Sequence, residues 1–326
     1  MNRKIIFMGT PEFATASLDA LVHAGFNVAA VVTAPDRPAG RGRQLRESDV
    51  KRRALELGLP VLQPEKLRDP AFLAKLDELN ATLYIVVAFR MLPELVWGKP
   101  ALGTLNLHAS LLPDYRGAAP INWAIINGEK KTGVSTFFIQ EEIDMGDLLL
   151  RRETEIGIDE NAGALHDRLK VIGAELLVAT VKDIFDGTME PVSQAQFAGD
   201  DKHAAPKINT SDCRIQWDLD ARRIHDLVRG MAPYPGAWTT WNEPGKPARQ
   251  LKVLRTHVAS IAKRHVKQGH VFVQENKLLV QCGKGELELL EVQMEGKRTM
   301  SAKDFLNGIG QVDMVRLGRS PGVSEA

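Results

Sequence analysis

Three polar side chains at alternate positions form the pattern in this sequence that is best suited to chemistry. Asn106, His108 and Ser110 carry an amide, an imidazole and a hydroxyl at the end of an apolar stretch, residues 102–107. Alternate side chains of a β-strand point to one face, so these groups converge if the stretch is a strand. Taken alone, Asn-x-His would mark a polar strand edge before a proline turn. Convergent polar groups beside the Leu-Leu-Pro turn at 111–113 can stabilise a developing charge, so we predict an active site.

Several carboxylates follow a second apolar stretch, residues 134–139. The turn at 140–147 holds Glu141, Glu142, Asp144 and Asp147. If residues 134–139 form a strand next to the one that carries His108, one carboxylate can orient the imidazole or move a proton. The pattern does not select among the four, and an acidic surface turn accounts for at least two of them.

A third feature is the segment at residues 35–46, which contains Arg37, Arg41, Arg43 and Arg46. Its proline and glycine content predicts an irregular loop rather than a helix or strand, and it is longer than ordinary loops between strands and helices. Arginine makes bidentate, permanently charged contacts with phosphate, so the segment indicates a phosphate-bearing partner. The alternative is a basic surface loop.

The first part of the chain alternates apolar, strand-like stretches with helical patterns. Such alternation predicts an α/β fold with a doubly wound, mostly parallel sheet that is covered on both faces. Ligands of these sheets bind beyond the carboxyl ends of the strands, which is where Asn106 and His108 are expected. We expect strands at 4–8, 28–33, 82–88, 102–107 and 134–139, and helices at 11–24, 48–57, 71–79 and 119–126.

The second part of the chain has a different pattern. A long helix is expected at 162–185, and the segment 187–205 then reads as a linker because it has glycine, proline and little periodicity. Beyond it, one helix at 220–231 precedes several short strands, which predicts a small β-barrel of the oligonucleotide-binding (OB) type. The predicted domains are therefore 1–186 and 206–326.

Charge is unevenly distributed although the whole chain carries only +1. Residues 1–205 hold 23 basic and 28 acidic residues, a net of −5, and the remainder holds 19 and 13, a net of +6. The stretch 246–274 has seven basic residues, Lys252 and Lys267 among them, and no acidic one. A solvated face normally mixes both signs, so this stretch indicates a polyanionic partner.

Composition excludes several classes of protein. Cys213 and Cys282 are the only cysteines and are far apart, which argues against disulfides and a thiolate zinc site. The start of the chain is too short for a signal peptide, and no apolar run is long enough to span a membrane. The turn after residue 8 lacks the glycine patterns of nucleotide-binding loops. We expect a cytoplasmic protein, and a monomer because no self-association pattern is present.

Two segments resemble the signature of the 10-formyltetrahydrofolate-dependent formyltransferases: residues 106–117, which read NLHASLLPDYRG, and residues 143–147, which read IDMGD. Other segments are similar to the branch of this family that acts on methionyl-tRNA, so the resemblance covers nearly the whole chain. These segments are residues 8–14, 35–42, 118–121, 214–217 and 229–237. The arginine loop and the carboxy-terminal domain are the features that indicate tRNA.

The resemblance implies a reaction and a role for each site residue. The amine of methionyl initiator tRNA would attack the formyl carbon of 10-formyltetrahydrofolate, and no metal would be needed. Asn106 and protonated His108 would donate hydrogen bonds to the resulting oxyanion, while Asp144 would orient His108 and assist proton transfer. The folate site would be lined by Ser110, Leu111, Leu112, Pro113, Phe89, Arg90, Met91, Leu92, Gln140, Glu142 and Ile143. The tRNA would meet Arg37, Arg41, Arg43, Arg46, Lys252 and Lys267.

The chain departs from the family pattern at two places, and two other functions remain open. Phe89-Arg90 stands where an aromatic residue and a glycine are expected, which affects the contacts with the pterin, and Glu141-Glu142 is more acidic than expected. One alternative is a formyltransferase of the same fold that acts on an amino sugar nucleotide or a purine intermediate. The other is a non-catalytic tRNA-binding protein, against which the retention of all three catalytic-type residues argues.

Overall fold

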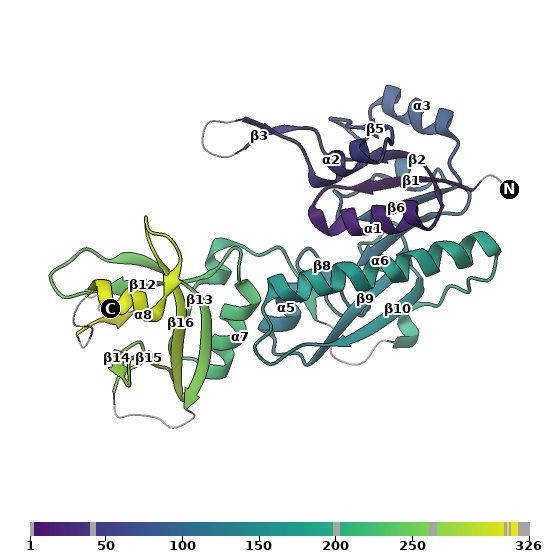
Figure 1. Cartoon of the computed structure of the whole chain (residues 1–326). Helices are drawn as coiled ribbons and strands as arrows, with labels where there is room; N and C mark the ends of the chain where they lie inside the picture. Colours follow the sequence, from purple (N-terminus) through teal and green to yellow (C-terminus); the bar gives the residue numbers. More distant parts are fainter. Residues whose placement is uncertain are drawn as a thin grey trace, which may run out of the picture. The chain divides into compact units, whose positions relative to one another are not determined.

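The computed structural model describes residues 3–39, 44–197, 203–260, 266–309, 312 and 314–318. The chain divides into two compact units (Figure 1). The first unit contains residues 1–120, 131–155 and 166–204, and the second contains 121–130, 156–165 and 205–326. Two short segments from the first half of the chain therefore belong to the second unit.

A seven-stranded sheet forms the centre of the first unit, with the strand order β10-β9-β7-β6-β1-β2-β5. The five strands from β7 to β5 are parallel, while β9 and β10 are antiparallel to their neighbours. This confirms the prediction of a doubly wound, mostly parallel sheet, to which the structure adds β5 and β10. The bounds are β1 Lys4–Gly9, β2 Asn27–Val32, β5 Val61–Leu62, β6 Leu83–Val87, β7 Thr104–His108, β9 Lys131–Phe138 and β10 Leu148–Glu155.

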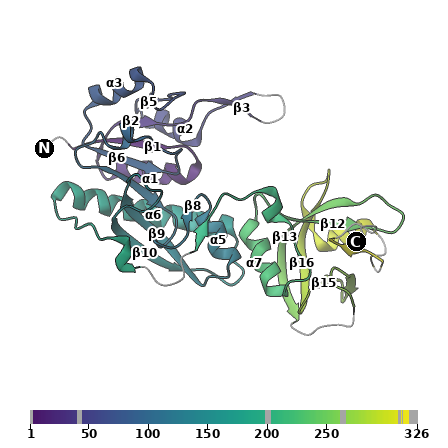
Figure 2. The same cartoon turned by 180° about the vertical axis from the view of Figure 1, so that it is seen from behind.

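Helices cover both faces of this sheet (Figure 2). On one face, Gly173 of α6 packs against Leu107 of β7, and α1 lies beside α6 through a ring contact between Phe13 and His166. On the other face, α3 and α4 bury an apolar cluster against β1 and β6. The helices of this unit are α1 Glu12–His23, α2 Asp49–Glu56, α3 Pro70–Leu79, α4 Glu94–Trp97 and α6 Ala162–Asp186, whereas α5, Pro120–Ile126, lies almost wholly in the second unit.

The arginine-rich segment is a β-ribbon at its base, not an irregular loop as predicted. β3, Arg37–Ala39, pairs antiparallel with β4, Gln44–Arg46, and the ribbon extends from the sheet in both views (Figures 1 and 2). Pro38 is tolerated because a two-stranded ribbon has free edges on which no hydrogen-bond donor is required. Arg41 and Arg43 lie outside the described residues.

A six-stranded antiparallel path, β14-β15-β16-β13-β12-β18, forms the centre of the second unit, and β17 pairs with β16. A bridge between His270 and Arg316 joins the two ends of this path, which is consistent with the predicted small barrel. Trp241 and Phe305 meet edge to face in its core, 5.1 Å apart. The strands are β12 Ala237–Asn242, β13 Arg249–Ser260, β14 Val271–Gln274, β15 Lys277–Gln281, β16 Glu286–Met294, β17 Met300–Ser301 and β18 Arg316–Leu317, with α8 at Ala302–Ile309.

Helix α7, Ala221–Met231, connects the barrel core with the two earlier segments of this unit. Arg229 is buried, pairs with Asp226 at 2.7 Å and donates to the carbonyl of Glu160 at 3.0 Å. The side chain of Asn122 donates to the carbonyl of Gly230 at 2.7 Å. These contacts bind residues from 121–130 and 156–165 to α7.

The predicted linker at 187–205 contains short elements. Val192 forms a β-bridge with Leu148, and η1 spans Gln194–Phe197. β11, Ala204–Ala205, pairs with β8, Arg116–Gly117, and η2 follows at Thr210–Cys213. The segment thus makes ordered contacts with the sheet and with the turn after β7.

Gly230 of α7 packs closely against α5, so Gly230→Ala should destabilise the protein. A Cβ there would be 2.5 Å from Cγ1 of Ile126 and 3.2 Å from the carbonyl oxygen of Asn122. Overpacking of this kind costs about 1–3 kcal/mol, which chemical denaturation measures. In the control Gly308→Ala, the new Cβ meets no atom within 4 Å, and stability should stay constant or rise by up to about 1 kcal/mol. Equal effects of the two substitutions would contradict this account.

Candidate active site

Strand β7 places Asn106 and His108 on one face of the sheet, as their spacing predicts. Asn106 pairs in register with Val86 of β6 and with Phe137 of β9. Leu107, between the two polar residues, faces α6 on the opposite side. The carboxyl end of β7 therefore presents an amide and an imidazole on the side away from α6.

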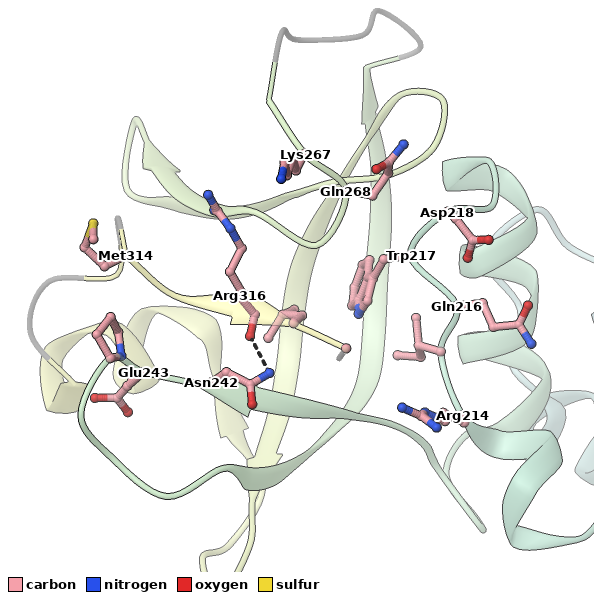
Figure 3. Close-up of a pocket in the computed structure, with 14 residues that line it drawn as sticks. Arg214, Gln216, Trp217, Asp218, Asn242, Glu243, Lys267, Gln268, Met314 and Arg316 are labelled. Atoms are coloured by element: carbon pink, nitrogen blue, oxygen red, sulfur yellow. Dashed lines mark hydrogen bonds between the residues drawn. The ribbon is translucent and has the colours of Figure 1, made fainter. Parts of the chain in front are cut away.

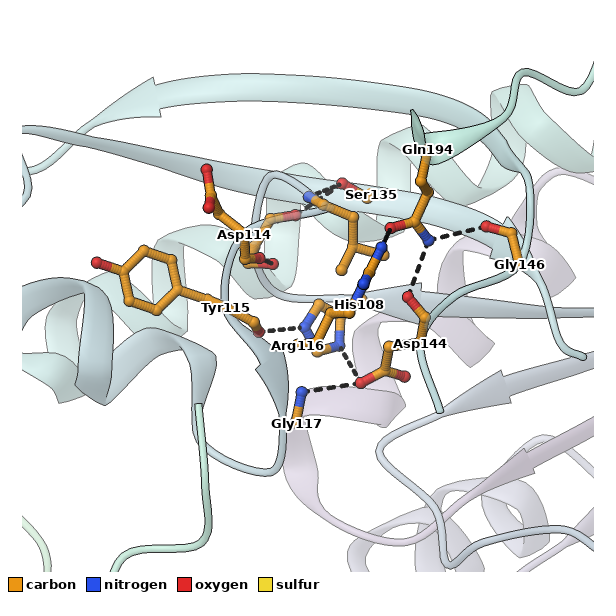
Figure 4. Close-up of polar contacts among 11 residues, drawn as sticks. His108, Asp114, Tyr115, Arg116, Gly117, Ser135, Asp144, Gly146 and Gln194 are labelled. Atoms are coloured by element: carbon orange, nitrogen blue, oxygen red, sulfur yellow. Dashed lines mark hydrogen bonds and ion pairs between the residues drawn. The ribbon is translucent and has the colours of Figure 1, made fainter. Parts of the chain in front are cut away.

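The imidazole of His108 is buried and is held from two directions (Figure 4). Nε2 lies 2.9 Å from the carbonyl oxygen of Tyr115, and because a carbonyl can only accept, Nε2 donates. Nδ1 lies 3.9 Å from Oδ2 of Asp144, within ion-pair range but beyond a direct hydrogen bond. Nδ1 is therefore the ring nitrogen that remains free to bond a ligand.

The structure brings Asp144, and none of the other three candidate carboxylates, to His108. Its Oδ2 also accepts a hydrogen bond from the backbone N–H of Gly117 at 2.9 Å. Asp144 has a φ of +54°, in the left-handed region that side chains with a Cβ seldom adopt. The backbone carbonyl of Asp147 accepts a hydrogen bond from the N–H of Phe138 on β9, and Glu141 and Glu142 are exposed.

The side-chain oxygen of Asn106 is buried, and it has no hydrogen-bond partner among the described residues. Most buried polar atoms in proteins are paired, so an unpaired one marks a place where a ligand can complete the bonding. This oxygen lies on the strand face that also carries His108. The side-chain oxygen of Asn106 is therefore available to accept a hydrogen bond from a ligand.

The turn after His108 is fixed by hydrogen bonds to neighbouring strands. Oγ of Ser135 on β9 donates to the carbonyl of Ser110 at 2.7 Å and accepts from the N–H of Leu112 at 3.1 Å. Arg151 on β10 donates to the carbonyl of Leu112 at 2.9 Å. The peptide bond before Pro113 is cis. Ser110 itself is buried and donates to Asp114, so its hydroxyl supports the turn.

The second predicted folate segment, residues 89–92, follows β6. Arg90 donates to the carbonyls of Pro64 and Glu65, and its guanidinium lies 5.6 Å from the ring centre of Phe89. Burial, and then the positive charge of Arg37, lower the pKa of Arg90. Met91 is 74% exposed, while Leu92 is buried in the core under α3 and α4. Arg90, Met91 and Leu92 line a hollow of about 410 Å³.

The remaining predicted folate residues differ in their accessibility. Gln140, Glu142 and Ile143 are exposed on the turn that carries Asp144. Leu112 is fully buried with Phe137 and Leu148, so it supports the site from beneath. Some of the predicted folate-binding residues are thus exposed on the turns, and others are buried beneath them.

The cations that were predicted to bind tRNA, and the basic stretch around Lys252, differ in the partners that the fold gives them. Arg37 and Arg46 face each other across the β3–β4 ribbon, both exposed. Lys252 donates to the carbonyl of Pro235 at 2.8 Å. Others in the basic stretch pair with acidic residues from outside it: Lys246 and Arg249 with Glu243, and Arg255 with Glu291. A stretch of the sequence that carries charges of one sign therefore does not form a surface of one charge sign.

Lys267 lies at a cavity of about 920 Å³ in the second unit (Figure 3). Arg214 and Arg316 also line this cavity, and among the described residues no ion pair is formed by any of these three cations. Trp217 and Leu317 supply apolar lining. The cavity also contains Asp218 and Glu243, so its charge is mixed with a basic excess.

Sequence reasoning missed Gln194, Ser135 and Arg151. Gln194 is buried and bonds Arg116 and the turn at Asp144, although it lies in the segment predicted as a linker. Its neighbourhood has no periodicity, so no local signal could have found it. Ser135 did have a signal, because a polar residue in an apolar central strand needs a partner.

The described residues contain no group of three or more His, Cys, Asp or Glu side chains that could hold a metal ion. No helix in the described ranges is long and apolar enough to cross a membrane. The contacts at the candidate site are hydrogen bonds and one carboxylate–imidazole pair.

The chain matches the models of a known family. Residues 3–181 match the model of the formyl transferase family, and residues 207–310 match that of the formyl transferase C-terminal domain. The chain therefore belongs to the formyl transferase family. Its curated relatives are methionyl-tRNA formyltransferases, and the match with them extends over nearly their whole length.

Two of these relatives show the extent of the similarity. The chain is 46% identical over 320 residues to the methionyl-tRNA formyltransferase of Parabacteroides distasonis, covering 97% of this chain and 98% of the relative. Identity to the Flavobacterium johnsoniae methionyl-tRNA formyltransferase is 45% over 306 residues, covering 94% and 96%.

Solved structures share the fold at much lower identity. WlaRD, a sugar 3N-formyl transferase, matches with a TM-score of 0.63 and 16% identity over 91% of this chain and 100% of its own. HypX from Aquifex aeolicus, in complex with tetrahydrofolic acid, matches with a TM-score of 0.59 and 17% identity over 93% and 46%. At this identity the likeness concerns the fold.

Ser135→Ala should destabilise the protein, because it leaves the carbonyl of Ser110 and the N–H of Leu112 without their buried partner. Such a loss costs about 1–3 kcal/mol of unfolding free energy, measured by chemical denaturation. Ser211→Ala, at an exposed position, serves as the control and should change stability by less than about 0.5 kcal/mol. If both variants matched the unsubstituted protein, Ser135 would have no part in holding the turn.

Proposed function

We propose that this protein transfers the formyl group of 10-formyltetrahydrofolate to the free amine of methionyl initiator tRNA. The observation that carries the proposal is the convergence of Asn106, His108 and Asp144 at the end of β7 in a chain whose full-length relatives are methionyl-tRNA formyltransferases. The products are N-formylmethionyl-tRNA and tetrahydrofolate.

The first step is attack of the substrate amine on the formyl carbon, which gives a tetrahedral centre with an oxyanion. Asn106 donates to this oxygen through its side-chain amide, and His108 donates through Nδ1. Because Nε2 is already bonded to Tyr115, donation from Nδ1 requires the imidazolium form. Both donors act most strongly as the charge develops, so they lower the barrier rather than merely bind substrate.

Asp144 has two tasks in this mechanism. Its carboxylate faces Nδ1 of His108 at 3.9 Å, which orients the ring. It also assists removal of the proton that the attacking nitrogen must lose, before N10 of the folate leaves with a proton. No bond between enzyme and formyl group is formed.

The residues around the site fit a folate co-substrate. A pterin has an apolar, planar body with polar edges, and exposed Met91 and Ile143 offer apolar contacts on the turns beside the site. The buried, unpaired oxygen of Asn106 offers a polar contact on the strand face. We assign the folate site to Phe89–Leu92, Ser110–Pro113 and Gln140–Ile143, with buried Leu112 as support.

The ribbon supports the tRNA as partner. Arg37 and Arg46 lie directly opposite each other, and neither forms an ion pair among the described residues. Like charges in this arrangement destabilise a ribbon, and a phosphate between them would relieve the repulsion. We propose that the tRNA backbone contacts Arg37 and Arg46 of this ribbon, together with Arg41 and Arg43, and also contacts Lys267 in the second unit, with Lys252 positioning the strand there.

An amino sugar nucleotide is the less favoured acceptor. The sugar formyl transferase of similar fold shares 16% identity, against 46% for a methionyl-tRNA formyltransferase. A small acceptor would not need the cationic ribbon. We further propose a catalytic domain at 1–186, a linker at 187–205 and a tRNA-binding domain at 206–326, acting as a monomer in the cytoplasm.

His108→Ala should lower kcat by about a hundredfold or more, because it removes one oxyanion donor. The Kd for methionyl-tRNA should stay within about twofold. Steady-state formylation and filter binding measure the two quantities. His23→Ala, an exposed histidine in α1, is the matched control and should behave as wild type. Near-normal kcat after loss of His108 would remove this residue from the mechanism.

Replacing Arg37 and Arg46 together by alanine should raise the KM for methionyl-tRNA and reduce the salt slope of binding by about one to two units, because two phosphate contacts are lost. Titrations at several salt concentrations give this slope. The control removes two cations that already have carboxylate partners, Lys75 with Glu78 and Lys99 with Asp77. An unchanged slope in the ribbon variant would assign the ribbon another task.

A further inference from the structure

One buried glutamine joins the two turns that meet at the candidate active site (Figure 4). Gln194 belongs to η1 and is only 4% exposed. Its Oε1 accepts from Nε and Nη2 of Arg116 at 3.2 and 2.6 Å. Its Nε2 donates to the backbone carbonyls of Asp144 and Gly146, at 2.8 Å each. A single amide thus uses its acceptor on one turn and both donors on the other.

The turn that Gln194 holds has a conformation that it would not keep without support. Asp144 has a φ of +54°, which is costly for a residue with a Cβ. Gly146 passes so close to β9 that a Cβ there would lie 1.7 Å from the carbonyl oxygen of Phe138. The two carbonyls bonded by Gln194 flank this tight passage, so the glutamine fixes the path of the turn.

Gln194 also fixes the opposite side of the site. Arg116 precedes Gly117, whose N–H donates to Oδ2 of Asp144. The guanidinium of Arg116 makes its two bonds to the same oxygen atom of Gln194. Both partners of the Gly117–Asp144 hydrogen bond are therefore held by one residue.

The segment that carries Gln194 is itself attached to the sheet. Val192 and Leu148 of β10 exchange two backbone hydrogen bonds, each 2.8 Å long. Three residues after Gln194, the ring of Phe197 lies 3.9 Å from the guanidinium carbon of Arg151. Because the segment is anchored on both sides of Gln194, this residue holds the turn at 143–147 in a fixed position relative to β10.

We propose that Gln194 is a positioning residue that sets the placement of the Asp144 carboxylate against His108. The proposal rests on the proposed function, since Gln194 acts through Asp144. It assigns a role in the reaction to the segment between α6 and the second unit. A shift of about 1 Å in a catalytic group can cost up to about a hundredfold in rate, so this positioning has a measurable effect.

The test uses Gln194→Glu, which can still accept from Arg116 but cannot donate to two carbonyl oxygens. We expect kcat for formylation to fall about tenfold or more, with the KM for methionyl-tRNA within about twofold. Gln194→Met has a similar length and no charge, and it should lose as much, which separates the loss of donors from the added charge. The matched control is Gln196→Glu, exposed in the same η1, which should retain wild-type kcat.

A double-mutant cycle separates positioning from a general structural effect. In an Asp144→Asn background, single-turnover rates should fall less than about threefold on adding Gln194→Met, because the carboxylate that Gln194 positions is gone. A further fall of about tenfold, or wild-type kcat in both single variants, would overturn the proposal. Thermal unfolding confirms that the variants compared are folded.

Hydrogen exchange gives a readout that does not depend on the reaction. Amides in residues 143–147 should exchange faster in Gln194→Met than in wild type, while those of β7 remain protected. Unchanged exchange rates of the amides in 143–147 would refute the proposal that Gln194 holds this turn. Wild-type protein that fails to formylate methionyl-tRNA would overturn the proposed function, and the exchange result would still decide whether Gln194 holds the turn.

Discussion

The antiparallel pairing of β7 and β9 is the constraint on which the candidate site depends. Phe138, at the end of β9, pairs with Leu105, whereas His108 is three residues further along β7, about 10 Å away. The hairpin turn at 139–147 must therefore fold back over the strand face to bring Asp144 to His108. The Gly117 N–H, the Gln194 amide and the close passage of Gly146 against Phe138 hold it there.

The same constraint explains which parts of the site could be predicted from the sequence. Asn106 and His108 share a face because a strand alternates, and this follows from local spacing alone. Asp144 could not be selected by pattern among four carboxylates, since the selection is made by the path of a turn across the sheet. Gln194 gave no signal, because its partners lie 48–78 residues away in the chain.

Composition alone was wrong about one segment and incomplete about another. Proline and glycine in residues 35–46 predicted an irregular loop, yet an isolated two-stranded ribbon has free edges and accommodates Pro38. The basic stretch from Lys246 onward indicated a polyanionic partner, but Lys246, Arg249 and Arg255 in it are paired with Glu243 and Glu291 from outside it. The pattern of charges along a sequence does not show which acidic residues the fold brings next to each cation. Cations without an ion-pair partner can therefore be identified only from the structure.

We propose that the site formed by Asn106, His108 and Asp144 formylates an amine carried by a tRNA, and the fold alone does not choose the acceptor. The most direct measurement is formyl transfer from 10-formyltetrahydrofolate by the purified protein, with methionyl initiator tRNA, uncharged tRNA and a UDP-amino sugar as parallel acceptors. The proposed acceptor requires product with the charged tRNA only. Product with the amino sugar and none with methionyl-tRNA would contradict it.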